Sequence, residues 1–370
     1  MSHSMLRSAF ALACALTCAQ AAPAHALNIL LTNDDGFEAA SLHAVYQRLT
    51  ASGHSVIISA PALDGTAQGG GLTIGRAVEA LPTASRGGAV PAGSPGLGTL
   101  PTDANVHYVN GTPVMSVLYA LDIVSKQKWG KAPDLVVSGI NYGLNVGRLW
   151  SGSGTVGAAL SAIQRGVPAI AVSADYPLSS YTAVSGLQPG AREYDLADFV
   201  VRLVRAVEAS RSSASQPLLP RNIGLNVSLP VFTPGTAATL PVKHTKTGEA
   251  VNYASVFVMN MARDWAPTLP AAPGVAFYSV NLLPLGVTRE SDNDARSEYN
   301  VVKLGQAAIS VVQATIQPTP WSPDALGDRI VARMAPPPPP VTPPPSTPAP
   351  AAPTTPSPTA PAPTPASASK

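Results

Sequence analysis

Short apolar runs alternate with helical patterns from residue 28 onward. Asn28–Thr32 is a continuous apolar run, which predicts a strand buried on both faces. Apolar side chains then recur with helical spacing over Ser41–Ser52, and Ser55–Ser59 is a second buried run. A strand, a helix and a strand within about thirty residues are typical of a β-α-β unit.

The same alternation continues to about residue 180 and weakens beyond it. Leu81–Asp103 interrupts it as a Gly- and Pro-rich stretch, which we interpret as a surface excursion. Strands alternating with helices predict an α/β fold with a doubly wound, mostly parallel sheet, and the short strand-like pieces at about 230–300 predict an appended β-rich arm. The further predicted strands are Val106–Val109, Leu135–Ile140, Ala169–Ser173, Asn222–Ser228 and Val311–Ile316, and the further helices are Pro113–Lys126, Thr155–Gln164 and Tyr194–Ser210.

The two ends of the chain differ from the rest in composition. Residues 1–26 have a positive residue, an apolar run and the small-residue site Ala24-His25-Ala26, which predict a signal peptide and export to the periplasm or the medium. Both cysteines lie in this segment, so we expect a mature protein without thiol chemistry. Residues 336–370 form a Pro-rich tail that we expect to be disordered. Residues 27–335 remain as one α/β domain, with a core at about 27–180 and a C-terminal part at about 181–335.

Charge excludes one class of partner. Two of the 23 basic residues, Arg7 and Lys370, lie in the two ends, and the remaining ones equal the 21 acidic residues in number. A formally neutral core argues against a groove for a nucleic-acid polymer. The apolar run of the signal is too short for a permanent membrane span, so we expect none in the mature form.

The polar tetrapeptide Asn33-Asp34-Asp35-Gly36 directly follows the first predicted strand. Ligands of open α/β sheets bind beyond the carboxyl ends of the strands. Adjacent carboxylates repel each other unless a cation lies between them, and oxygen ligands suit Mg²⁺, Mn²⁺ or Ca²⁺. The alternative is a polar turn in which an Asp caps the next helix.

Two further polar segments should reach the same edge. Asn141 and Asn145 follow the predicted strand Leu135–Ile140; the first could give an oxygen to a metal and the second a donor to an anion. Ser151–Gly157 opens a helix, and helix N-termini bind phosphate. Alternatively, these residues form only turns and a helix cap.

A nicotinamide site is a weaker interpretation. Gly152, Gly154 and Gly157 spell G-x-G-x-x-G, and Asp175 follows the next strand. The preceding strand ends near Ile140, however, about a dozen residues before the position that a dinucleotide fingerprint requires. A serine nucleophile would need a G-x-S-x-G elbow, which is absent around Ser153. The histidines show no metal-binding spacing.

Five short motifs follow one another between residues 28 and 173. They are Asn33-Asp34-Asp35-Gly36, Ala60-Pro61, Asn110-Gly111-Thr112-Pro113, Ser138-Gly139-Ile140-Asn141 with Gly143, Asn145 and Gly147, and Ser153-Gly154-Thr155-Val156. In this order and at these spacings the motifs resemble those of the SurE family, the survival-protein nucleotidases. A weaker similarity continues in Leu225–Pro230 and in the acidic stretch Glu290–Glu298.

The resemblance implies a Rossmann-like core and a divalent-metal phosphomonoesterase that acts on nucleoside 5′- and 3′-monophosphates as a homodimer or homotetramer. Mg²⁺ or Mn²⁺ would be held by Asp34, Asp35, Asn141 and Thr66, the last in place of the family's usual Ser. Asp34 and Asp35 would be catalytic, with Asp34 as a general base or a nucleophile. The phosphate would be bound by Asn33, Asn145, Ser153, Gly154 and Thr155.

Two departures from the family pattern leave substrate preference and oligomer contacts open. Val114-Met115-Ser116 replaces the usual Ala-Asp-Cys, and Ser161-Ala162 stands where a Glu is usual. Two alternative functions therefore stay open: a secreted SurE-like binding protein without turnover, and a broad-specificity acid phosphatase acting on other small phosphate monoesters.

Overall fold

The computed structural model describes residues 26–211, 213, 215–251, 253–258, 279–284 and 292–314. The predicted signal peptide before residue 26 and the Pro-rich tail lie outside the described residues. The chain divides into two compact units at Ile316, and the described residues all belong to the first.

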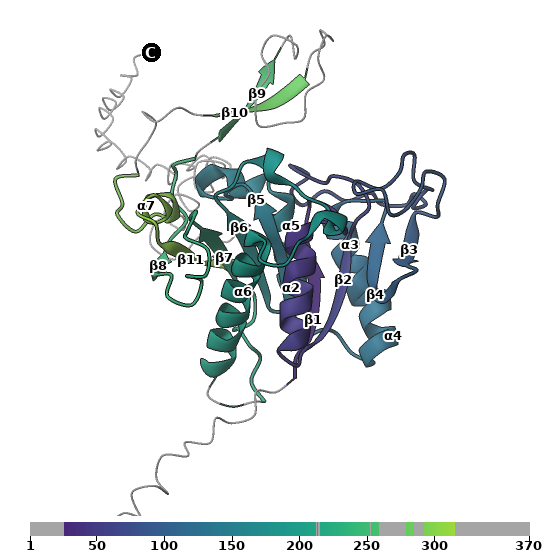
Figure 1. Ribbon diagram of the computed structural model, residues 1–370, viewed down its shortest axis with the longest axis horizontal. Coiled ribbons are helices and arrows are strands. Elements are labelled where there is room, and N and C mark those ends of the chain that lie inside the picture. Colours follow the sequence, from purple (N-terminus) through teal and green to yellow (C-terminus); the bar gives the residue numbers. More distant parts are fainter. Residues whose placement is uncertain are drawn as a thin grey trace, which may run out of the picture. The chain divides into compact units, whose positions relative to one another are not determined.

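A nine-stranded sheet forms the centre of this unit, in the order β3-β4-β2-β1-β5-β6-β7-β11-β8 (Figure 1). The six strands from β4 to β7 run parallel, whereas β3 and β11 pair antiparallel with β4 and β7. The predicted α/β class with a mostly parallel sheet is therefore confirmed. The strands are β1 (Asn28–Thr32), β2 (Ser55–Pro61), β3 (Leu97–Leu100), β4 (Asp103–Val109), β5 (Leu135–Tyr142), β6 (Ala169–Ala174), β7 (Ile223–Leu229), β8 (Val242–Thr245) and β11 (Ala307–Gln313).

Helices cover both faces of the sheet. Successive side chains of a strand point to opposite faces, and in the central strands both sets are apolar and have to be buried. In β1, Ile29 and Leu31 pack in the layer formed with α2 and α6, and Leu30 packs in the layer formed with α3 and α5. The continuous apolar runs of the sequence are thus explained by burial on two sides. The helices are α2 (Ala40–Ala51), α3 (Pro113–Tyr119), α4 (Ser125–Trp129), α5 (Gly154–Gln164), α6 (Arg192–Ala209) and α7 (Glu298–Lys303).

The strand order reverses at β1. The chain passes from β1 to β2 and β4 on one side, and then returns to place β5 on the other side of β1. Such a switch point leaves a crevice beyond the carboxyl ends of the two flanking strands, and it is where open α/β sheets bind ligands. The segments after β1 and β5 therefore meet at this crevice.

The C-terminal part departs from the predicted elements in detail. β8 and β11 extend the main sheet, and β9 (Tyr253–Val258) pairs with β10 (Ser279–Pro284) in a separate two-stranded sheet. The last predicted strand, Val311–Ile316, is shifted, since β11 spans Ala307–Gln313 and Ile316 lies outside the described residues. The predicted helix Pro113–Lys126 contains a π-helical turn at Ala120–Val124.

The stretch Leu81–Asp103 is part of the folded core and of the sheet, so its interpretation as a surface excursion is wrong. Leu81 and Val90 are buried in the layer of α2 and α6, and Leu97–Leu100 forms edge strand β3. Gly and Pro hide these contacts in the sequence because they break the periodicity on which the prediction depends.

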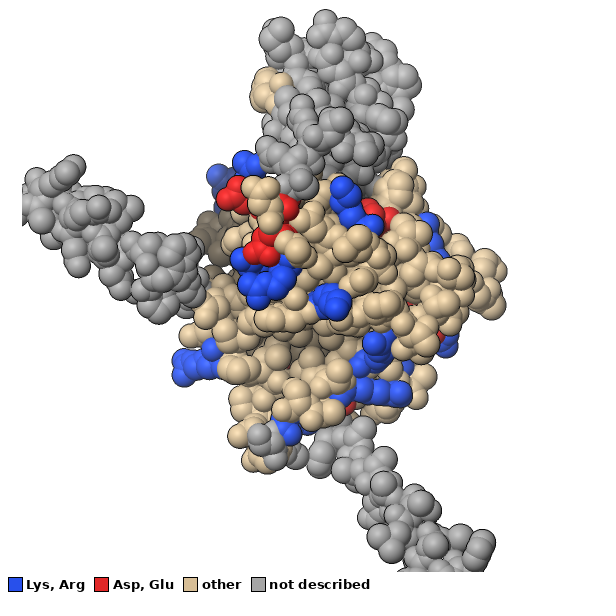
Figure 2. Space-filling view, turned by 90° about the vertical axis from the view of Figure 1, so that its left-hand side faces the viewer, with Lys and Arg blue, Asp and Glu red and all other residues tan. Residues whose placement is uncertain are grey.

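The surface carries both kinds of charge. On the face shown in Figure 2, basic side chains are scattered, and several lie beside acidic ones. None of the helices in the described part of the chain combines the length and the apolar character needed to cross a membrane.

Candidate metal and phosphate site

The turn after β1 is held by its own side chain. Asn33 Nδ2 donates to the Gly36 carbonyl at 3.0 Å, and Asn33 Oδ1 accepts from the Gly36 N–H at 3.2 Å. Gly36 has a φ of +109°, a conformation that side chains disfavour. Asn33 thus shapes the turn, and the phosphate-binding role predicted for it stays a prediction.

Asp34 and Asp35 are buried side by side at this turn, each only 2% exposed. Burial raises the pKa of Asp34 to about 6, although a hydrogen bond from Thr155 opposes the shift. Burial and the Asp34 carboxylate raise the pKa of Asp35 well above its usual range, with Arg86 opposing. Two buried carboxylates with raised pKa values form a place where positive charge is favourable.

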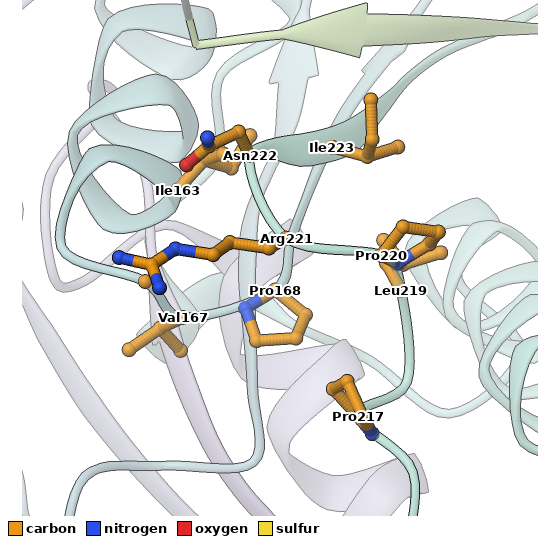
Figure 3. A pocket seen from close by; sticks show the side chains of 10 residues that line it. Ile163, Val167, Pro168, Pro217, Leu219, Pro220, Arg221, Asn222 and Ile223 are labelled. Atoms are coloured by element: carbon orange, nitrogen blue, oxygen red, sulfur yellow. The ribbon is translucent and has the colours of Figure 1, made fainter.

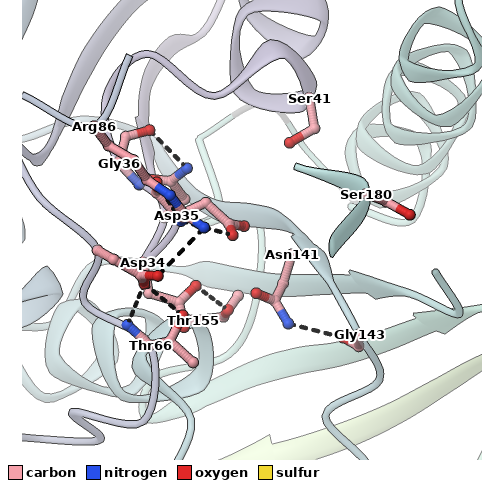
Figure 4. A network of polar contacts seen from close by, with 12 residues as sticks. Asp34, Asp35, Gly36, Ser41, Thr66, Arg86, Asn141, Gly143, Thr155 and Ser180 are labelled. Atoms are coloured by element: carbon pink, nitrogen blue, oxygen red, sulfur yellow. Dashed lines mark hydrogen bonds and ion pairs between the residues drawn. The ribbon is translucent and has the colours of Figure 1, made fainter. Parts of the chain in front are cut away.

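Helix α5 begins against Asp34. Thr155 Oγ1 donates to Asp34 Oδ1 at 2.6 Å, and Ser153 caps the helix by accepting from the Val156 N–H at 3.1 Å. A Cβ on Gly154 would lie 2.7 Å from the Asp34 Cβ and 2.9 Å from its Oδ2, so the helix approaches this closely because residue 154 is glycine. The N-terminus of α5 and the carboxylates therefore line one space (Figure 4).

The end of β5 brings Asn141 to the same space. Its pairing with β6 is irregular between Ser138 and Asn141, and such a bulge redirects the following side chains. Asn141 Nδ2 donates to the Gly143 carbonyl at 2.8 Å, which leaves the amide oxygen free to face the carboxylates (Figure 4).

The loop from Asn141 to Gly147 is fixed by the C-terminal part of the chain. Asn226 Nδ2 donates to the Asn145 carbonyl at 2.9 Å, and Glu298 Oε1 accepts from the Gly147 N–H at 2.7 Å. Asn145 is 8% exposed, and its Nδ2 has no hydrogen-bond partner among the residues described. A buried donor without a partner fits the predicted anion-binding role of Asn145.

Thr66 lies next to Asp34 through its neighbour Gly65, whose N–H donates to the Asp34 carbonyl at 2.8 Å. The Thr66 hydroxyl donates to Asp64 Oδ1 at 2.6 Å, which leaves its lone pairs available to a cation. Thr66 can therefore act as a neutral ligand while its hydroxyl donates a hydrogen bond to Asp64.

Arg86 is a residue of this site that sequence reasoning missed. Its guanidinium donates to the Asp35 carbonyl at 2.8 Å and lies 3.4 Å from Asp35 Oδ1 and 3.3 Å from Asp64 Oδ2. The same group stacks 3.9 Å over the ring of Tyr181. No sequence pattern marks Arg86, since it is a lone basic residue in the Gly- and Pro-rich stretch Leu81–Asp103.

The donor set suits a hard divalent cation. Asp35 Oδ2 is buried and has no hydrogen-bond partner within the described part of the chain, and it faces the space shared with Asp34 and Asn141. The described residues contain no group of three His, Cys, Asp or Glu side chains placed to hold a metal ion. A cation here would therefore be held by two carboxylates and by neutral oxygens of Thr66 and Asn141. Oxygen ligands of this kind are typical of Mg²⁺ and Mn²⁺.

The glycines of the G-x-G-x-x-G pattern have packing roles. Gly154 faces Asp34, and a Cβ on Gly157 would lie 2.1 Å from the Gly69 carbonyl. β5 ends at Tyr142, well before Gly152, which is not the arrangement of a dinucleotide fingerprint.

A separate pocket of about 250 Å³ lies at the opposite ends of the strands from this site (Figure 3). Val167 and Pro168 precede β6 and Ile223 begins β7, so the pocket is at the amino ends of these strands. The chemistry predicted from the sequence lies at the carboxyl ends, and this pocket has no part in it.

A family model described as survival protein SurE matches residues 29–301. The chain is 36% identical to the 5′-nucleotidase SurE of Solidesulfovibrio magneticus over 225 residues, 61% of this chain and 72% of that protein. It is 31% identical to an acid phosphatase of Yarrowia lipolytica over 205 residues, 55% of this chain and 56% of that protein. The chain thus spans little more than half the length of the acid phosphatase.

Two longer matches extend over most of the domain. The 5′-nucleotidase SurE of Caldanaerobacter subterraneus is 27% identical over 285 residues, 77% of this chain and 91% of that protein. The crystal structure of the SurE protein from Aquifex aeolicus superposes with a TM-score of 0.56 at 21% identity, covering 83% of this chain and 99% of that one. The structural similarity supports the α/β fold.

Proposed function

Since the chain belongs to the SurE family, we propose that it is a divalent-metal-dependent phosphomonoesterase acting on nucleoside 5′- and 3′-monophosphates. The observation that carries the proposal is the buried Asp35 Oδ2, an oxygen without a hydrogen-bond partner in the described structure, beside the equally buried Asp34. Two such carboxylates at the switch point need a cation, and a helix N-terminus borders the same space.

The proposed roles follow from what each side chain already contacts. Asp34, Asp35, Thr66 and Asn141 would hold Mg²⁺ or Mn²⁺, which when bound draws electron density from a phosphoryl oxygen and makes a water molecule more acidic. Thr155 donates to Asp34 Oδ1 and so orients the Asp34 carboxylate. Asp34 would act as a general base or as a nucleophile.

The phosphate would be bound by neutral donors. Asn145 offers its buried Nδ2, and Ser153, Gly154 and Thr155 supply the first turn of α5. These donors stabilise the negative charge that develops on the phosphoryl oxygens. Asn33 supports the site indirectly, through the turn that places the two carboxylates.

The names of the relatives favour nucleotides as substrates, and one of them supports an alternative. Several relatives are 5′-nucleotidases, whereas the Yarrowia lipolytica relative is an acid phosphatase, which supports a broader range of phosphate monoesters. The signal-like composition of residues 1–26 supports export to the periplasm or the medium, and the family resemblance supports a homodimer or homotetramer.

Phosphate release by the purified protein tests the proposal. We expect turnover of p-nitrophenyl phosphate and of nucleoside 5′- and 3′-monophosphates with Mg²⁺ or Mn²⁺, and its loss with EDTA. Turnover that EDTA leaves unchanged would contradict the metal site. Nucleotide binding without phosphate release would instead identify a binding protein that has lost turnover.

A further inference from the structure

The segment that carries Arg86 is anchored to the residues that follow the two aspartates. The Glu38 carboxylate accepts from the N–H groups of Gly87 at 2.8 Å and Ala89 at 2.7 Å, and Glu38 is 3% exposed. The Arg86 N–H donates to the Ala62 carbonyl at 3.0 Å. The backbone on both sides of Arg86 is therefore fixed, which restricts the guanidinium to a position beside Asp35 and Asp64.

The guanidinium is held there by contacts on several sides. It stacks on Tyr181, lies 3.3 Å from Asp64 Oδ2, and donates to the main-chain carbonyl of Asp35 at 2.8 Å. The Arg86 side chain is 20% exposed, so water reaches only part of it. A planar group with donors in a fixed fork can contact a carbonyl, two carboxylates and a ring at once, which an ammonium cannot.

Arg86 contacts only one of the two carboxylate oxygens of Asp35. Oδ1 lies 3.4 Å from the guanidinium, whereas Oδ2 is buried and has no hydrogen-bond partner in the described part of the chain. With the main-chain carbonyl and one carboxylate oxygen both facing Arg86, rotation of the Asp35 side chain is restricted. Oδ2 is then left facing the space next to Asp34 and Asn141 (Figure 4).

We propose that Arg86 is a positioning residue of the cation site, which fixes Asp35 so that Oδ2 is presented to a divalent cation. The inference rests on the proposed function, because it assumes that a cation binds between Asp34 and Asp35. Arg86 itself touches neither the cation nor the phosphate in this role; it acts through Asp35.

The charge of Arg86 and its orienting role predict opposite effects of its removal on cation affinity. As a positive charge near the site, Arg86 repels a cation, and its removal would tighten cation binding. As an orienting group, its removal would loosen binding, since partners of metal ligands commonly contribute about 10–100-fold to affinity. Arg86→Lys keeps the charge but loses the fork, and Arg86→Met loses both.

The test measures Mn²⁺ binding to the EDTA-treated protein by isothermal titration calorimetry. We expect Arg86→Met to weaken binding about tenfold and Arg86→Lys to weaken it by a smaller factor. The matched control is Arg48→Met, because Arg48 also pairs with an aspartate, Asp198, at 2.8 Å and lies 4.8 Å over a tyrosine ring, but on the last turn of α2. We expect the control to bind Mn²⁺ as the unmodified protein does.

Each outcome separates the inference from the proposed function. Equal or tighter Mn²⁺ binding by Arg86→Met, in a protein with an unchanged melting temperature, would overturn the positioning role alone. An unmodified protein that binds no Mn²⁺ would overturn the cation site and the inference with it. If Arg86→Met does not fold, Arg86→Lys decides, since unchanged Mn²⁺ affinity in that variant contradicts the role of the fork.

Steady-state kinetics distinguish this positioning role from a direct contact between Arg86 and the substrate. A positioning residue that acts through the cation should be rescued at saturating Mn²⁺, with kcat and KM both returning close to those of the unmodified protein. A KM that stays raised at saturating Mn²⁺ would show that Arg86 binds the phosphate itself, which would overturn the positioning role.

Discussion

The loops after β1 and β5 meet at one point of the sheet but are stabilised in different ways. Asn33–Gly36 carries the charge, and its turn is closed by hydrogen bonds between its own residues. Asn141–Gly147 carries neutral amides and depends on Asn226 and Glu298 from the C-terminal part. The charged groups of the site therefore lie in adjacent residues of one short turn. The neutral amides of the second loop, by contrast, are held in place by residues that are distant in the sequence.

Removing charge from the first loop should have the largest effect. Asp34→Asn keeps the shape but removes the charge and the proton acceptor, and we expect turnover to fall about a thousandfold, comparable with losing an oxyanion-hole donor. The measurement is phosphate release with Mn²⁺. The matched control is Asp175→Asn, an exposed carboxylate just beyond β6, which should keep its activity. An active Asp34→Asn protein would refute the assignment.

Filling the space beside the first loop should have the next largest effect. Gly154→Ala places a methyl group 2.7 Å from the Asp34 Cβ and 2.9 Å from the Gly65 carbonyl, and we expect about a hundredfold loss of turnover and about 1–3 kcal/mol of stability. Turnover and thermal unfolding are both measured. In Gly152→Ala the added Cβ would meet nothing closer than 3.9 Å, so this control should remain active. Equal loss in both variants would point to the helix start as a whole.

The second loop should respond to pH through Glu298. This residue is 1% exposed, and burial raises its pKa to about 7 from an ordinary 4.5. Its contribution to stability is therefore fully present below about pH 4.5 and is lost as the pH rises through 7. Glu298→Gln stays neutral at every pH. Between pH 5 and pH 8 we therefore expect its free energy of unfolding to fall by about 2 kcal/mol less than that of the unmodified protein.

Thermal unfolding in EDTA at several pH values measures this difference. Asp34 and Asp35 also have raised pKa values and shift stability in the same direction, so both proteins lose stability as the pH rises. The informative quantity is the difference in the free energy of unfolding between the unmodified protein and Glu298→Gln. If this difference does not grow from pH 5 to pH 8, ionisation of Glu298 does not destabilise the folded protein.

The smallest effect is expected at Asn226. Asn226→Ala removes the donor to the Asn145 carbonyl, and we expect a cost of about 1 kcal/mol and a several-fold rise in the KM for p-nitrophenyl phosphate. The neighbouring buried Ser228 offers a comparison, because its hydroxyl reaches the loop only through Ser173, at 3.5 Å, whose own hydroxyl accepts from the Asn145 N–H at 3.2 Å. Ser228→Ala should therefore change the KM less than Asn226→Ala does. A changed kcat with an unchanged KM would place Asn226 outside the phosphate-binding side.

The parallel core and the polar segments at its edge could be predicted from the sequence, because the residues that form each of them are adjacent in the chain. β1 is a continuous apolar run, and its aspartates follow within three residues. The partners that orient the site could not be predicted, since Arg86 lies 51 residues from Asp35 and Glu298 lies 151 residues from Gly147. Long-range contacts of single side chains leave no period in the sequence.

The central position of β1 also sets an order of assembly. β1 is synthesised first, but its neighbour β5 begins at Leu135, and Thr155 lies 121 residues beyond Asp34. A chain that emerges from its amino end therefore exposes the edge of β1 and two unpartnered acids until well over a third of it has been made. Contacts of such high sequence separation fold slowly, so the acidic turn is complete only at a late stage of folding.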